Sequence, residues 1–85
     1  MDSIIEWAAS ATPGDQLEYG RGYLASARHE RTVAIDADDP VPPEVERFCN
    51  AADDAWHLYL ADQVALVQRR HGKFDYSYIA VRARH

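Results

Sequence analysis

An apolar stripe between Val45 and Tyr59 limits what this chain can fold into more than any other feature. Pro42 and Pro43 precede it, and proline suits the first turn of a helix. The apolar side chains then recur at intervals of three and four residues, which is the spacing of one helix face: Val45, Phe48, Cys49, Ala52, Ala55, Trp56 and Tyr59. We therefore predict an amphipathic helix from Pro43 to between Leu60 and Asp62, with its apolar stripe against the rest of a small domain.

The residues after this helix have the pattern of a β-hairpin. Val64–Arg70 and Phe74–Arg82 are rich in β-formers, and His71-Gly72-Lys73 between them is suited to a turn. The alternation of side chains predicts two faces. One holds Val64, Leu66, Ile79 and Val81, and the other holds Val67, Tyr76 and Tyr78.

Two shorter elements are expected near the N-terminus. Ser3 and Glu6 have the spacing of a capping box, which predicts a helix from Ile4 to Ala11. Pro13 and the glycine after it end this helix. The alternating pattern of Gln16–Ala25 predicts a strand, with two glycines that allow close approach by a helix or ligand.

Together these elements predict an α+β fold in a single domain, residues 1–85: a three-stranded antiparallel sheet with two helices. Residues 26–40 are expected to be irregular, with one short β-like run at Thr32–Ile35 and an acidic turn after it. The order helix, strand, helix, strand, strand resembles that of a winged-helix domain if residues 26–37 add a helical turn.

Charge divides the chain into two parts. Residues 1–63 have a net charge of −9, whereas residues 64–85 have a net charge of +4 and contain one acid, Asp75. A basic hairpin with aromatic residues is suited to bind a polyanion. The overall charge of −5 argues against indiscriminate binding to nucleic acid or anionic membranes.

We therefore expect a nucleic-acid-associated accessory protein or regulator that uses this hairpin. Cationic side chains would neutralise phosphates, and aromatic rings, including Phe74, would stack on bases. The candidate binding residues are Arg69, Arg70, Lys73, Tyr76, Tyr78, Arg82 and Arg84. The sequence leaves two questions open. The first is whether these cations converge on one surface. The second is whether they only keep an edge strand soluble while the aromatic side chains pack in the core.

The alternative is a protein-interaction module. Glu46, Asp53 and Asp54, with the acidic run at residues 36–39, form a negative surface that could face a basic partner. The same surface disfavours entry of the main helix into a DNA groove. A homodimer through Tyr76 and Tyr78, or through a free strand edge, is a further possibility.

Other classes of function are disfavoured by what the sequence lacks. The single cysteine, Cys49, excludes an internal disulfide, and the four histidines show no metal-ligand spacing. Gly20-Arg21-Gly22 lacks the third glycine of a phosphate-binding loop. No cofactor and no catalytic activity are expected. The absence of a signal-peptide pattern or a long apolar run favours a cytoplasmic protein with no membrane contact.

Three segments resemble short uncharacterised proteins of phages and prophages: Tyr19-Gly20-Arg21-Gly22-Tyr23-Leu24, Leu66-Val67-Gln68-Arg69-Arg70 and Tyr78-Ile79-Ala80-Val81-Arg82. The resemblance covers about a third of the chain and implies no catalytic residues. Phage genomes encode small DNA-binding regulators and also small acidic inhibitors of host proteins. The resemblance therefore implies one or the other of these two roles.

Overall fold

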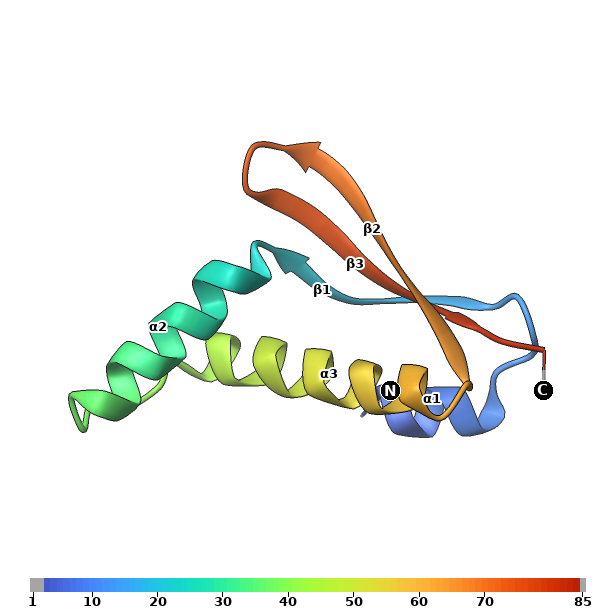
Figure 1. Ribbon diagram of the computed structural model, residues 1–85, viewed down its shortest axis with the longest axis horizontal. Helices are drawn as coiled ribbons and strands as arrows, with labels where there is room; N and C mark the ends of the chain where they lie inside the picture. The colour runs from blue at the N-terminus through green and yellow to red at the C-terminus, as the bar shows by residue number, and fades with distance from the viewer. Residues whose placement is uncertain (1–2, 85) are drawn as a thin grey trace.

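The structure, a computed structural model, describes residues 3–84. Its elements follow in the order α1 (Ile4–Ser10), β1 (Gln16–Gly22), α2 (Leu24–Asp36), α3 (Pro43–Leu60), β2 (Val64–Gly72) and β3 (Asp75–Arg82). The strands form an antiparallel sheet in the order β1-β3-β2 (Figure 1). The predicted α+β class with a three-stranded antiparallel sheet is confirmed.

The helices lie on one side of the sheet. Figure 1 shows α3 running beneath the strands, with α1 near its C-terminal end and α2 near its N-terminal end. Two groups of buried side chains hold these layers together. The first joins α1, α3 and the sheet through residues such as Ile4, Leu58 and Ala80. The second joins α2 to α3 through Ala27, Val45 and Cys49.

The prediction for residues 26–40 was wrong: most of this segment is the helix α2, so residues 3–84 contain three helices. β1 correspondingly ends at Gly22, whose φ of +124° favours glycine, and not at Ala25. The side chain of the N-cap residue, Tyr23, makes no capping hydrogen bond, so the start of α2 has no capping signal in the sequence. Tertiary contacts hold α2 in place: Ala27 is buried against α3, and Arg28 pairs with Asp53 at 3.0 Å and Arg31 with Glu46 at 3.2 Å at the surface.

The predicted stripe of α3 is confirmed only in part. Val45, Cys49, Ala52 and Ala55 are buried. Trp56 and Tyr59 are instead 52% and 45% exposed, and their rings stack on each other at 5.2 Å between centroids. Trp56 lines a shallow cavity of about 300 Å³ beside β2, at the open edge of the sheet. Trp56 therefore lies beside this edge, with Tyr59 stacked on it, and neither ring is in the core.

The predicted faces of the hairpin were also wrong. The strand pairing places Leu66 opposite Ala80 and Arg70 opposite Tyr76, so Tyr76 and Tyr78 share the helix-facing side with Leu66. Ile79 pairs with Val67 on the other side. The cause is an irregularity between Arg70 and Gly72, which adds one residue to β2. A shift of one residue moves every side chain of a strand to the opposite face.

Candidate nucleic-acid interface at the hairpin end

Three cationic side chains lie at the closed end of the β2–β3 hairpin, which projects away from α3 in Figure 1. Arg69, Arg70 and Lys73 are all exposed. Arg69 pairs with Ser77 and Arg70 with Tyr76, so the two guanidinium groups lie on opposite faces of the ribbon. None of the three forms an ion pair among residues 3–84. Their positive charge is therefore available to an external anion.

The acid nearest to these cations is neutralised by a residue of β1. Arg21 donates from Nε and Nη2 to the two carboxylate oxygens of Asp75, at 2.9 and 3.0 Å. The Arg21 hydrogen bonds lower the pKa of Asp75 below its ordinary value, so this carboxylate is ionised near neutral pH. We refer to Arg69, Arg70 and Lys73, with the Arg21–Asp75 pair beside them, as the basic tip.

The Arg21–Asp75 pair predicts a pH-dependent contribution to stability. The pKa of Asp75 is lower in the folded protein than its unfolded value of about 3.9. Its stabilising effect is therefore present above about pH 4 and is lost as pH falls through the folded pKa. We expect Asp75→Asn to lower the urea midpoint of unfolding slightly near pH 7, because both side chains are solvent-exposed, with a difference from wild type that shrinks toward pH 3.

Arg21→Gln provides the matched control, because it removes the other partner of the same pair. Urea midpoints of both variants, measured across this pH range, should converge with wild type at the acidic end. A difference that stays constant with pH would contradict the assignment of the effect to this pair.

Aromatic rings lie beside the basic tip on its helix-facing side. The ring of Tyr23, at the corner between β1 and α2, lies 5.1 Å from that of Phe74 and 6.1 Å from that of Tyr76. Phe74 is 59% exposed and Tyr23 is 36% exposed, whereas Tyr76 is half-buried behind them. The Lys73 ammonium lies 5.3 Å from the centroid of the Phe74 ring. We call Tyr23, Phe74 and Tyr76 the aromatic platform.

Tyr78 has a structural position. It is only 5% exposed, and its hydroxyl accepts a hydrogen bond from the Leu24 backbone N–H at 3.0 Å. The first N–H groups of a helix have no partner within the helix. Tyr78 thus supplies the cap that the N-terminus of α2 otherwise lacks, and its ring packs 5.5 Å from that of Phe48. Its aromatic face is not accessible at the surface.

The last two predicted cations lie at the other end of the hairpin. Arg82 donates to the carbonyl of Ala8 from Nε at 2.9 Å and to that of Gln63 from Nη1 at 2.8 Å. Arg84 follows the end of β3 and is exposed. The structure therefore brings Arg69, Arg70 and Lys73 together and leaves Arg82 and Arg84 apart from them. The cations of the hairpin form two groups, not one continuous surface.

His71 stabilises the irregular end of β2. Its Nε2 lies 2.6 Å from the hydroxyl of Ser77, which is buried opposite Arg69. Ser77 lines neither of the two cavities found among residues 3–84, and the nearby Asp75 is paired with Arg21. We therefore assign the contact between His71 and Ser77 a structural role. This contact holds the extra residue that sets the hairpin register.

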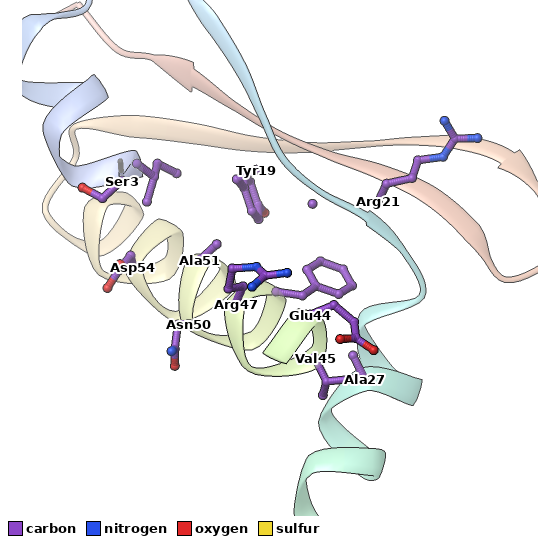
Figure 2. Close-up of a pocket in the computed structure, with 13 residues that line it drawn as sticks. Ser3, Tyr19, Arg21, Ala27, Glu44, Val45, Arg47, Asn50, Ala51 and Asp54 are labelled. Atoms are coloured by element: carbon purple, nitrogen blue, oxygen red, sulfur yellow. The ribbon is translucent and has the colours of Figure 1, made fainter. Parts of the chain in front are cut away.

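A groove lies between β1 and the helix α3, apart from the cavity that Trp56 lines (Figure 2). This groove of about 600 Å³ is lined by cationic, anionic and apolar side chains, including Arg47, Asp54 and Phe48. Figure 2 shows Arg21 extending away from it. Burial, and secondarily the proximity of Tyr78, raises the pKa of Tyr19, so its phenol stays protonated near neutral pH. The mixed charges of the groove favour no single class of ligand.

Comparisons with protein-family models, with curated proteins and with solved structures find no match to this chain. Within residues 3–84, no group of three or more His, Cys, Asp or Glu side chains is placed to hold a metal ion. No helix in the same part of the chain is long and apolar enough to cross a membrane.

Sequence reasoning missed two residues of this site. Arg21 lies 54 residues before Asp75, and only the pairing of β1 with β3 brings them together. The sequence pattern placed Tyr23 within a strand, whereas it is the N-cap residue of α2, at the corner where the chain leaves β1. The pattern around Gly20 and Gly22 marked this region for close approach, but it did not indicate which side chains would meet there.

Proposed function

We propose that this protein is a small non-enzymatic nucleic-acid-binding accessory protein or regulator, and that the basic tip is its contact with the phosphate backbone. One observation carries the proposal. The three cations of a projecting hairpin end have no carboxylate partner among the described residues, and the one acid beside them is held by Arg21. Cationic side chains in such a position release counterions when they bind phosphates.

The arrangement of the fold supports a contact through the hairpin. The order α1, β1, α2, α3, β2, β3 resembles that of winged-helix domains, in which this hairpin has the place of the wing. The exposed side of α3 carries Glu44 and His57 and has Asp53 and Asp54 beside it. Ion pairs and the exposed Arg47 offset part of this negative charge, but α3 has no cluster of cations like that of the basic tip, so the hairpin is the better contact.

The alternative of an acidic protein-binding surface receives less support. Asp53 and Glu46, two of the carboxylates that define it, form ion pairs with Arg28 and Arg31 of α2. Surface pairs of this kind contribute little to stability, but they place a positive charge beside each acid. The negative surface of α3 is thus partly neutralised within the protein.

The test is the salt dependence of binding to labelled oligonucleotides, measured by fluorescence anisotropy from low to physiological salt. Each phosphate contact contributes a slope of about −0.9 in log K against log salt for duplex DNA, and about −0.7 for single strands. Removing both guanidinium groups with Arg69→Ser/Arg70→Ser should weaken binding on all sequences and reduce the slope by roughly 1.4 to 1.8.

Arg47→Ser/Arg84→Ser is the matched control, because it removes the same charge from exposed positions outside the basic tip. Binding of this control should stay close to that of wild type. The proposal is wrong if no oligonucleotide binds at low salt, or if both double variants lose affinity equally, since the effect would then reflect net charge alone.

A further inference from the structure

We propose that the hairpin end binds an unpaired nucleic-acid strand, with a base stacked on the aromatic platform and the adjoining phosphates on Arg70 and Lys73. This inference rests on the proposed function and adds the class of nucleic acid to it. It applies to single-stranded DNA and single-stranded RNA alike, because both present free base faces and a phosphate backbone.

Phe74 occupies a position that disfavours it in two independent ways. Its φ of +58° is in the left-handed region, where glycine or asparagine is favoured and a bulky side chain is strained. Its ring is also 59% exposed, so it gains little from burial. A phenylalanine in such a turn contributes poorly to folding. Within the chain the ring meets Tyr23 and the Lys73 ammonium, and its exposed part is free for a contact outside the chain.

The surroundings of Phe74 form a surface of suitable shape and charge. Tyr23 and Tyr76 lie 6.1 Å apart with an interplanar angle of 28°, and Tyr23 also contacts Phe74. Tyr76 is half-buried, whereas Tyr23 and Phe74 are exposed. Arg70 shares this side of the ribbon, since it pairs with Tyr76. The Arg70 Nε donates to the Gly72 carbonyl at 3.3 Å, which places the guanidinium group at the same end of the ribbon as the rings.

Lys73 supplies a second cation at the same place. Its ammonium lies over the Phe74 ring, which is a cation–π contact that a stacked base can replace. When displaced from the ring, the flexible lysine side chain can reach a phosphate of the same strand. The base and the phosphate would therefore be bound by neighbouring residues, as is typical of proteins that bind single strands.

This arrangement discriminates between unpaired and duplex nucleic acid. In a duplex the base faces are stacked on one another and are not accessible to a side chain, whereas an unpaired strand can splay a base onto an aromatic ring. Duplex DNA offers its phosphates to the basic tip but nothing to the aromatic platform. We therefore expect the platform to add affinity only for the unpaired strand.

The test compares wild type with Phe74→Asn on a labelled oligothymidine, an unstructured RNA oligonucleotide and a duplex of the same length. Asparagine tolerates the left-handed conformation, so the variant should unfold at the same temperature as wild type or higher. Its affinity for both single strands should fall about 10-fold, since stacking of one base contributes a 5- to 150-fold effect. Its affinity for the duplex should stay unchanged.

Two further variants control for other causes. Phe74→Trp retains a ring at the turn and should restore single-strand affinity. Tyr59→Asn removes an exposed aromatic ring near the C-terminal end of α3, outside the hairpin, and should leave binding unchanged. A loss of affinity in Tyr59→Asn equal to that in Phe74→Asn would overturn the inference.

The outcomes separate this inference from the proposed function. If wild type binds single strands and duplex equally, loses both with Arg69→Ser/Arg70→Ser, and is insensitive to Phe74→Asn, the proposed function holds and the inference is wrong. If wild type binds neither form at low salt, both are wrong. A loss in Phe74→Asn confined to one of the two single strands would contradict the inference, because the platform is expected to stack bases of DNA and RNA alike.

Discussion

Replacing Gly20 with alanine should destabilise this protein even though glycine is usually a weak residue in a strand. A Cβ at position 20 would overlap the ring of Phe48, which packs directly against the β1 backbone. Phe48 cannot move freely, because it also packs against Tyr78 and the α2–α3 cluster. Overpacking of this kind costs about 1–3 kcal/mol. It outweighs the gain of about 0.5–1 kcal/mol expected for alanine over glycine in a strand.

Thermal unfolding measures this effect, since each 1 kcal/mol shifts the midpoint by about 4–8 °C in a domain of this size. Gly72→Ala is the matched control, because nothing lies within 4 Å of its added Cβ. It should leave the midpoint unchanged or raise it slightly. Phe48→Leu makes room at the contact, so the double variant Gly20→Ala/Phe48→Leu should lose less than the sum of the single changes. Strict additivity would show that the ring is not the cause.

The same contact shows how far the sequence predicts this fold. The apolar stripe and the prolines before it correctly predicted α3, and the β-rich runs correctly predicted the hairpin. The two glycines of β1 indicated a close approach, and the structure identifies the neighbour as Phe48. Local patterns suffice where an element has its own start, spacing and stop signals.

The two wrong predictions, for α2 and for the faces of the hairpin, have a common physical origin in contacts between separate segments of the chain. The N-cap residue of α2 makes no capping side-chain hydrogen bond, and the helix is held instead by Ala27 packing against α3 and by the Tyr78 hydroxyl on its first N–H. The hairpin register depends on one extra residue near His71, which the hydrogen bond to Ser77 holds. No single-segment pattern contains either piece of information. A single inserted residue was enough to move Tyr78 from a predicted surface position to the core.

The candidate site was predictable in composition but not in arrangement. The sequence correctly located a basic, aromatic segment, and Arg69, Arg70 and Lys73 lie together at its closed end. The sequence pattern did not separate these residues from Arg82. In the structure Arg82 lies at the open end of the hairpin, where it bonds to the carbonyls of Ala8 and Gln63. The sequence pattern also could not reveal that Arg21 neutralises Asp75, a contact between strands that are far apart in sequence.

Replacing Arg82 with methionine should cause a large loss of stability and no specific loss of nucleic-acid binding. The guanidinium group bonds to the carbonyl of Ala8, in the last turn of α1, and to that of Gln63, before β2. Carbonyls at the end of a helix have no partner within the helix, and a cation there also interacts favourably with the helix dipole. Hydrogen bonds to charged groups contribute about 1.5–3 kcal/mol each, and because the contact to Gln63 is exposed to solvent and contributes less, we expect a loss of about 2–4 kcal/mol.

Urea unfolding gives the free-energy change, and Arg84→Met is the matched control, because it removes the same charge from an exposed neighbour. Arg82→Lys should recover only part of the loss, since one ammonium group cannot reproduce the two-nitrogen contact. Where Arg82→Met remains folded, its salt slope for oligonucleotide binding should equal that of wild type. A stable Arg82→Met variant with a reduced slope would instead place Arg82 on the phosphate backbone and contradict its role as the residue that joins α1 to the base of the hairpin.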